Sequence, residues 1–279
     1  MERSLSGKEI KAFEAYLFGE ERSVATVEKY LRDVKSLLAF LNGKTLTKAV
    51  VLEYKNGLLV KYAVTSANSM IAAVNAFFRF LGWHELCVKQ FKIQKSAFAT
   101  EEKELSREEY LRLVETARHR GNDKLSLIIQ TICGTGIRVS ELKYITVESV
   151  EKGEATVNCK GKNRRIFIVS ALKRRLLEYI RKQKIKSGSV FVTKTGKSVN
   201  RHSVWREMKR LCKAANVSPS KVFPHNLRHL FARTFYGIEK DIAKLADILG
   251  HASINTTRIY IVTTAVEHKR KMENMRLIV

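Results

Sequence analysis

The chain has 279 residues, 45% of them hydrophobic, which is enough to bury a core in each of two ordinary domains and argues against a disordered chain. Lys and Arg number 52 against 27 Asp and Glu, and the formal net charge of +25 favours a polyanionic partner, in practice nucleic acid. Four cysteines without a CxxC pair, a polar N-terminus and the lack of about 18 consecutive apolar residues argue against a disulfide scaffold, secretion and a membrane span, so a cytoplasmic protein is expected.

The first part of the chain is predicted to form a small four-helix domain over residues 1–95, because its apolar residues recur at intervals of three and four. Ser6 and Glu9 have capping-box spacing at the start of the first helix. Asn42 and Gly43 are typical of a helix end and close the second. The predicted helices cover residues 7–19, 24–41, 45–62 and 66–81.

A charged stretch without apolar periodicity, residues 96–104, is predicted to be an exposed linker to a second domain over residues 105–279. The second domain begins with helices, the first of them capped by Ser106 and Glu109. The pattern then changes to short β-branched segments around the turn-prone residues 160–163, which indicates a β-hairpin. The helices are expected over residues 106–118, 123–133 and from 200 onward, and the strands over residues 155–159, 165–169 and 189–192. The predicted fold class is mainly α with a small antiparallel β-sheet.

The segment GTGIRVSEL, residues 134–142, places two glycines shortly before an arginine. Gly134 and Gly136 are expected to end one helix, so that Arg138 projects from the start of the next. An isolated arginine in this setting usually pairs with a surface glutamate. A nucleotide-binding loop is rejected, because the glycines follow a helix rather than a strand and lack both a third glycine and a trailing Lys-Ser/Thr.

The segment FPHNLRH, residues 223–229, begins a helix with proline and puts His225 and Arg228 on one face, where both could touch one phosphate. His225 and His229 also stand four residues apart, as in some zinc-binding helices. The residue after His225 is Asn226 instead of glutamate, and no third ligand is evident, so no metal site is expected.

Lysine and tyrosine complete the set of reactive groups. The predicted hairpin turn contains Lys160 and Lys162, which are solvated surface groups unless a phosphate lies within their reach. Residues 249–260, LGHASINTTRIY, place His251 in a turn before a short helix that ends near Tyr260. Taken alone, a tyrosine after such a helix belongs to the core in most proteins.

Read together, these residues are the groups that phosphoryl transfer needs in the absence of a metal. The guanidinium groups of Arg138 and Arg228 have the shape to hold a phosphodiester whose oxygens gain charge. The phenol of Tyr260, with an ordinary pKa of about 10, needs a nearby imidazole to take its proton at neutral pH. A lysine with a lowered pKa could protonate the departing oxygen.

The sequence resembles the tyrosine recombinases, also called the phage-integrase family, and is similar to their short Xer-like members. The resemblance rests on GTGIRVSEL, the hairpin lysine, PHNLRHLFA and LGHASINTTRIY, and on their order along the chain. It spans the second domain, whereas the first resembles the family's helical, SAM-like core-binding domain only in size and patterning. It implies a SAM-like core-binding domain followed by an α+β catalytic domain.

The resemblance implies that Arg138 and Arg228 clamp the scissile phosphate while Tyr260 attacks it and forms a 3′-phosphotyrosyl bond. That bond conserves the energy for resealing, so neither ATP nor any other cofactor or metal is implied. The remaining implied roles are proton transfer for His225, a hydrogen bond to the phosphate for His251, protonation of the leaving 5′ oxygen for Lys160 and buttressing of the arginines for Glu141. Many relatives have one lysine in the hairpin where this chain has two, so Lys162 stays an alternative to Lys160.

The partners implied by the resemblance are double-stranded DNA and further copies of this chain, assembled as a tetramer on two DNA sites. Whether the free protein is a monomer, and which accessory proteins take part, is left open. The apolar tail from about residue 263 is expected to dock either on a neighbouring subunit or on its own domain.

Two alternatives share parts of this pattern. A type IB topoisomerase-like enzyme has the same chemistry, but the small first domain and the Xer-like motifs argue against it. A catalytically idle DNA-binding protein is disfavoured by the complete set of reactive groups. The sequence does not separate the resolution of chromosome or plasmid dimers from the integration and excision of a mobile element.

Overall fold

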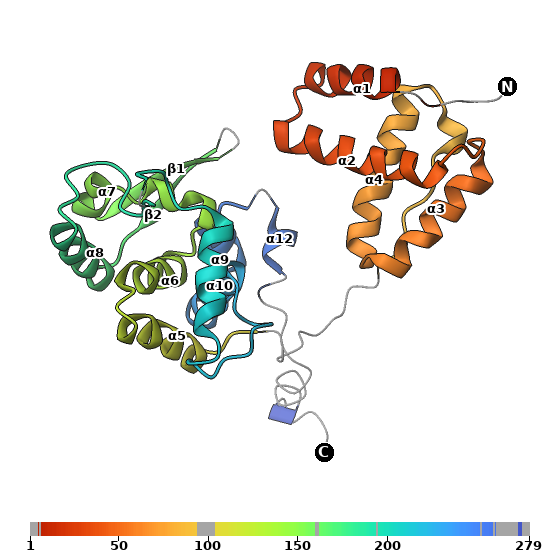
Figure 1. Cartoon of the computed structure of the whole chain (residues 1–279). Coiled ribbons are helices and arrows are strands. Elements are labelled where there is room, and N and C mark those ends of the chain that lie inside the picture. Colours follow the sequence, from red (N-terminus) through yellow and green to blue (C-terminus); the bar gives the residue numbers. More distant parts are fainter. Residues whose placement is uncertain are drawn as a thin grey trace. The chain divides into compact units, whose positions relative to one another are not determined.

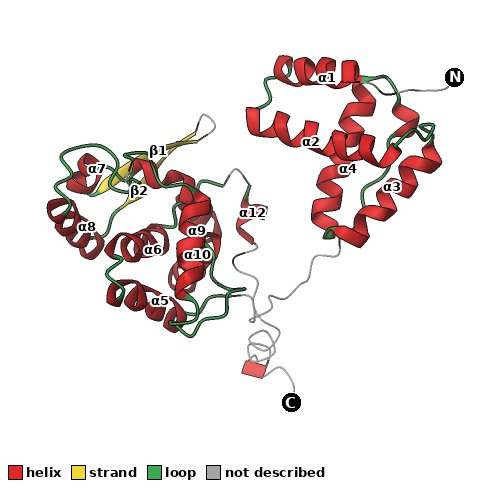
Figure 2. Cartoon of the chain, in the orientation of Figure 1, coloured by secondary structure: helices red, strands yellow, loops and turns green. Residues whose placement is uncertain are grey.

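A computed structural model of the chain describes residues 5, 7–93, 104–159, 162–193, 195–251, 253–258, 260 and 273–274. The chain divides into two compact units, Met1–Lys95 and Ser96–Val279, and helices dominate both (Figure 1; Figure 2). The predicted linker over residues 96–104 lies outside the described residues except at its last position. None of the helices in the described part of the chain combines the length and the apolar composition needed to span a bilayer.

The first unit contains the four predicted helices and a short 3-10 turn. They are α1 (Gly7–Gly19), α2 (Val24–Leu41), α3 (Lys48–Lys61), α4 (Val64–Phe80) and η1 (His84–Leu86). Ser23 and Thr47 cap α2 and α3 by accepting hydrogen bonds from main-chain N–H groups of the first turn. Asn42 ends α2 in the left-handed conformation, as predicted. Ser6 lies outside the described residues, so its role as a cap stays a prediction.

The core of the first unit lies between α1, α2 and α4. Phe13, Leu37 and Phe77 are fully buried at its centre, one from each of these helices. The rings of Phe13 and Phe77 meet edge to face at a centroid distance of 5.1 Å. All residues of this core belong to the first unit, so the unit has the apolar interior of an independent domain.

The second unit has nine helical segments and one β-hairpin among its described residues. The first part comprises α5 (Arg107–His119), α6 (Asp123–Thr135), η3 (Val139–Tyr144), α7 (Val147–Lys152), β1 (Glu154–Cys159) and β2 (Lys162–Phe167). The second part comprises α8 (Ser170–Lys182), α9 (Arg201–Leu211), α10 (Pro224–Glu239), α11 (Ile242–Leu249) and α12 (Ile254–Arg258). The predicted capping box of Ser106 and Glu109 is present at the start of α5.

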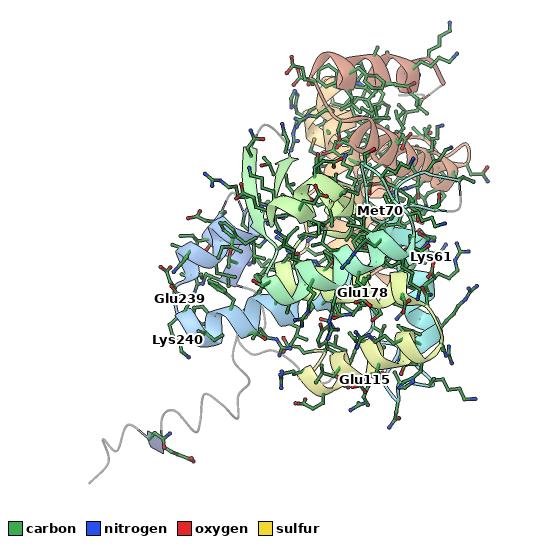
Figure 3. All side chains as sticks on the ribbon, turned by 90° about the vertical axis from the view of Figure 1, so that its left-hand side faces the viewer. Lys61, Met70, Glu115, Glu178, Glu239 and Lys240 are labelled. Atoms are coloured by element: carbon green, nitrogen blue, oxygen red, sulfur yellow. The ribbon has the colours of Figure 1, made fainter. Side chains whose placement is uncertain are left out.

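Helix α6 is the central element of the second unit and packs against α5, α8, α9 and α10 (Figure 1). Its residues Ser126, Leu127 and Ile129 are buried on different sides, because neighbouring helices surround it. Helix α10 begins with Pro224 and ends at Glu239 and Lys240, which Figure 3 labels. The C-terminal end of α6 and the first turns of α10 thereby meet, and this meeting point carries the candidate site.

The predicted sheet is present, but two details of it were wrong. Strands β1 and β2 are antiparallel with Cys159 opposite Lys162, so residues 162 and 163 belong to β2 and not to the turn in which they were predicted. The third predicted strand, residues 189–192, forms only isolated bridges, at Ser189 to one segment and at Val192 to another. Its apolar residues insert into the core instead of extending the hairpin, so the described sheet has two strands.

Candidate active site

Arg228 lies at the centre of the site and is 1% exposed. The first turns of α10 direct its side chain toward the ends of two other helices. Its Nη1 donates a hydrogen bond to the carbonyl of Gly136 at 2.5 Å, and its Nη2 donates to the carbonyl of Leu249 at 2.6 Å. Burial above all, with the nearby charge of Arg138, lowers the pKa of Arg228 to about 10, so the group stays protonated at neutral pH.

The glycine before Arg138 is required by the backbone and by packing. Gly136 ends α6 with φ of +66°, and a Cβ there would lie 2.4 Å from the ring of Phe231. The chain then turns so that Arg138 becomes the N-cap of η3, where a helix start was predicted. Its side chain stays partly exposed and is placed to reach a ligand from solvent.

Glu141 holds two arginines with one buried carboxylate. Its Oε1 accepts from Arg138 Nη1 at 2.9 Å, and its Oε2 accepts from the main-chain N–H of Arg138 at 2.8 Å and from Arg164 Nη2. Burial alone would raise the pKa of Glu141, but the hydrogen bonds from Arg138 and the charge of Arg164 hold it below its usual value. The carboxylate is therefore ionised at neutral pH and fixes both guanidinium groups.

Tyr260 follows α12 and is 2% exposed, but it is not enclosed by apolar groups alone. Its side chain lies close enough to the guanidinium of Arg228 to affect the pKa of that group. Three imidazoles surround its ring, with centroid distances of 6.1 Å to His225, 4.4 Å to His229 and 5.6 Å to His251. The phenol thus reaches an arginine of the pair within a single chain.

The hydrogen bonds of His251 define its tautomer. Its Nε2 lies 2.9 Å from Arg228 Nη2, and its Nδ1 lies 2.8 Å from Thr257 Oγ1. A guanidinium can only donate, so Nε2 accepts and the proton of the neutral ring is on Nδ1, which donates to Thr257. Burial and the charge of Arg228 lower the pKa of His251 to about 4, in agreement with a neutral ring.

The other two imidazoles are also kept neutral. Burial lowers the pKa of His229 to about 4, and the neighbouring His225 adds to the effect. Desolvation by surrounding side chains, followed by the charge of Arg228, lowers the pKa of His225 as well, although this residue is exposed. Neutral imidazoles are able to accept a proton, which is what a phenol nucleophile requires of its surroundings.

The structure brings six of the seven predicted site residues together: Arg138, Glu141, His225, Arg228, His251 and Tyr260. Lys160 lies outside the described residues, as does the predicted docking tail apart from residues 273–274. In the described part of the chain no cluster of His, Cys, Asp or Glu could hold a metal ion.

Three residues of the site were not predicted. Arg164 shares Glu141 with Arg138, His229 packs against Tyr260, and Thr257 is hydrogen-bonded to His251. A signal existed for the first of these, because β-strand alternation puts Arg164 on the same inward face as Ile166 and Ile168. Nothing in the sequence singles out Thr257, whose role depends on the fold of residues 251–257.

Two family models match the chain. The model described as the phage integrase family matches residues 103–266, more than half of the chain. The phage integrase N-terminal SAM-like domain matches residues 10–85. The chain belongs to the phage integrase family, the tyrosine recombinases, which are enzymes that transfer DNA strands.

Within this class the chain is similar to Xer proteins over nearly its whole length. Tyrosine recombinase XerA of Pyrococcus furiosus is 33% identical over an alignment that covers 99% of this chain and 97% of that protein. XerA of Thermococcus kodakarensis is 30% identical, with coverage of 95% and 93%. XerD of Halalkalibacterium halodurans is 29% identical, with coverage of 84% and 86%.

Solved structures show the same architecture. The crystal structure of XerA recombinase has a TM-score of 0.55 and 26% identity, covering 98% of this chain and 99% of that one. A lambda integrase dimer bound to a COC′ core site has a TM-score of 0.75 at 19% identity, covering 91% and 94%, and supports the fold alone. The expected arrangement of a SAM-like domain and a catalytic domain is confirmed.

Proposed function

We propose that this chain is a site-specific DNA recombinase that cuts and rejoins DNA through a 3′-phosphotyrosyl bond of Tyr260. The observation that carries the proposal is the position of Tyr260 beside the buried Arg228, whose hydrogen-bond partner His251 stacks on the Tyr260 ring. Arg138 is close enough to lower the pKa of Arg228. A nucleophile and two fixed cations at one point are the requirements for attack on a phosphodiester.

The proposed cleavage step uses these residues together with Lys160. The phenolic oxygen of Tyr260 forms a bond to phosphorus, and the bond from phosphorus to the 5′ oxygen breaks. The phenol proton passes to the neutral ring of His225, and Lys160 donates a proton to the departing 5′ oxygen. The guanidinium groups of Arg138 and Arg228 balance the charge that gathers on the non-bridging oxygens. A 5′ hydroxyl of a partner strand reverses the same step and reseals the DNA.

His251 takes part in binding the phosphate after a change of partner. In the DNA-free protein its Nε2 accepts from Arg228, so it must be protonated at Nε2 or shift its proton there before it can donate to a phosphate oxygen. The phosphate charge favours such a donor. Glu141 keeps Arg138 and Arg164 in place during this change, because its hydrogen bonds do not involve Tyr260 or His251.

The proposed partner is double-stranded DNA, bound by both units, in a tetramer of this chain that joins two sites through a four-way junction. The support is similarity to lambda integrase, solved as a tetramer bound to a Holliday junction, and to XerH, solved with difH substrate. The proposed task is recombination between short sites, for dimer resolution or for a mobile element. The tail from about residue 263 is proposed to dock in this assembly.

The first test is trapping of the covalent intermediate. Duplexes that the protein retains are selected from a random-sequence pool, and a nick is placed so that the short cleaved strand diffuses away. We expect a protein–DNA adduct in the presence of EDTA, because two guanidinium groups take the place of a metal ion. Tyr260→Phe is expected to bind the same duplex without forming the adduct.

Denaturing gel electrophoresis measures the adduct, and a mobility shift measures the binding. An adduct that persists in Tyr260→Phe would overturn the assignment of the nucleophile. Relaxation of supercoiled plasmid without any exchange between two selected sites would instead favour a topoisomerase-like enzyme.

A further inference from the structure

Arg164 on β2 faces the interior of the second unit. Its side chain is 10% exposed, whereas the side chain of the next residue, Arg165, is 70% exposed. Strand alternation accounts for the difference, because Arg164 shares a face with Ile166 and Arg165 takes the opposite one. A buried arginine next to a site that binds an anion requires an explanation beyond surface charge.

The contacts of Arg164 join three separate elements. Its Nη2 donates to Glu141 of η3, and its Nη1 donates to the carbonyl of Ile248 at the end of α11. Its stem lies against Gly250, where a Cβ would be 2.6 Å from the Cδ of Arg164. The hairpin is thereby tied both to the carboxylate that holds Arg138 and to the turn that carries His251.

A second contact holds the other strand of the hairpin. Tyr144 of η3 donates its hydroxyl proton to the carbonyl of Asn158 on β1 at 2.9 Å. Beyond these attachments, only Cys159 on β1 and Asn163 and Lys162 on β2 remain in the paired strands. Tyr144 and Arg164 are therefore the last attachments to the body of the unit, among the described residues, before the turn residues 160 and 161.

We propose that Arg164 is a positioning residue that fixes the hairpin turn relative to the arginine pair, so that the hairpin lysine reaches the leaving 5′ oxygen. The inference rests on the proposed function and adds to it that Arg164 positions the lysine that protonates the leaving oxygen. A proton donor acts only within hydrogen-bond reach of the atom it protonates, and a displacement of about 1 Å costs roughly a hundredfold in rate. Loss of Arg164 should therefore impair leaving-group protonation more than phosphate binding.

A sulfur-substituted substrate separates these two effects. In a 5′-bridging phosphorothiolate, sulfur replaces the leaving oxygen, so the bond from phosphorus to sulfur breaks and the sulfur departs as a thiolate. A thiol has a pKa of about 8.5, far below that of an alcohol, so the thiolate needs no acid. A variant that has lost only the positioning of its acid regains activity on this substrate.

The experiment measures single-turnover adduct formation by the full chain on nicked duplexes with either the ordinary or the sulfur-containing scissile bond. The variants are Arg164→Gln, Arg164→Lys and, as the matched control, Arg165→Gln. The double substitution of Lys160→Ala with Lys162→Ala removes the hairpin acid whichever lysine supplies it and defines full rescue. Each variant is judged by its ratio of the two rates, which a reduced folded fraction does not alter, because it lowers both rates equally.

We expect Arg164→Gln to be about a hundredfold slower than the wild type on the ordinary bond and within about threefold of it on the sulfur-containing bond. Arg164→Lys keeps the positive charge but can make only one of the two attachments, so its ratio of the two rates should lie between those of Arg164→Gln and the wild type. Arg165→Gln should keep the wild-type ratio.

Equal losses of Arg164→Gln on both substrates would overturn the inference and place Arg164 with the phosphate clamp or the general fold. A wild-type rate of this variant on the ordinary bond would overturn it too, as would failure of the double lysine variant to be rescued. The proposed function itself fails only if the wild type forms no adduct on either substrate, or if Tyr260→Phe forms one, and the inference then fails with it.

Discussion

Among the described residues, no carboxylate forms an ion pair with the buried Arg228. Its guanidinium is buried, and its acceptors, the carbonyls of Gly136 and Leu249 and the ring of His251, are all neutral. Its Nε has no hydrogen-bond partner in the described part of the chain. A bound anion would stabilise this buried cation, because the anion provides the opposite charge that the neutral partners lack. At the scale of the residue, this arrangement favours phosphate binding at the cost of some stability.

The buried imidazoles predict a dependence of stability on pH. The pKa values of His229 and His251 are lowered to about 4, below the ordinary value of 6.5, mainly by burial. Between these pH values the unfolded chain binds protons that the folded chain does not, so the free energy of unfolding falls as the pH drops from about 6.5 toward 4. After allowance for partial exposure, we expect a loss of up to about 1 kcal/mol per pH unit for each ring.

Urea denaturation at pH 7.5 and at pH 5, followed by circular dichroism, measures this loss. His229→Gln should show a smaller difference between the two pH values than the wild type, because glutamine does not titrate. Substitution of the exposed His202 in α9 by glutamine is the control and should leave the difference unchanged. An unaltered difference in His229→Gln would show that its burial does not set the pH dependence.

At the scale of the element, the ends of two helices provide the carbonyl groups that hold Arg228. Helices α6 and α11 both end at a glycine in the left-handed conformation, Gly136 and Gly250. The carbonyls of Gly136 and of Leu249, next to these ends, are no longer needed within the helices and accept from Arg228. The glycines therefore position the carbonyl groups that accept hydrogen bonds from Arg228. They do not form a nucleotide-binding loop.

The two glycines of the GTG motif predict opposite effects of the same substitution. Gly136→Ala should destabilise the protein by at least about 2 kcal/mol, since the φ of +66° disfavours a side chain and its Cβ would meet Phe231 at 2.4 Å. It should also reduce adduct formation, because the displaced carbonyl no longer holds Arg228.

Gly134→Ala is the matched control, because this glycine lies within α6 and an added Cβ would meet only the side chain of Leu172, at 3.8 Å. It should stabilise the helix by up to about 1 kcal/mol. Thermal denaturation of both variants checks the pair. Equal effects of the two substitutions would contradict the distinction between a helical and a left-handed glycine.

At the scale of the whole molecule, the charge is divided unequally. Residues 1–95 contain 15 basic and 9 acidic side chains, and residues 96–279 contain 37 and 18. The unit that contains Arg138 and Arg228 thus also has the larger positive excess. Such a field accelerates encounters with DNA and places many cations where they can displace counterions from phosphates.

The charge predicts a steep dependence of DNA affinity on salt. Each phosphate neutralised by a lysine or arginine releases bound counterions, so the affinity for a selected duplex should fall by more than about a hundredfold between 50 and 200 mM salt. Titration by fluorescence anisotropy at several salt concentrations measures the slope. A flat response over this range would contradict the electrostatic account.

The sequence by itself determined the family, the helical elements and most of the site, because helix periodicity, caps and short motifs depend on neighbours along the chain. The structure decided what depends on residues distant in sequence. Residues 162 and 163 pair with β1 instead of lying in the turn, because pairing satisfies their main-chain groups. The third strand is absent from the described sheet because its apolar residues pack in the core. The hydrogen bonds of Arg164 to Glu141 and Ile248 likewise join three elements that are distant in sequence, so no local sequence pattern could predict them.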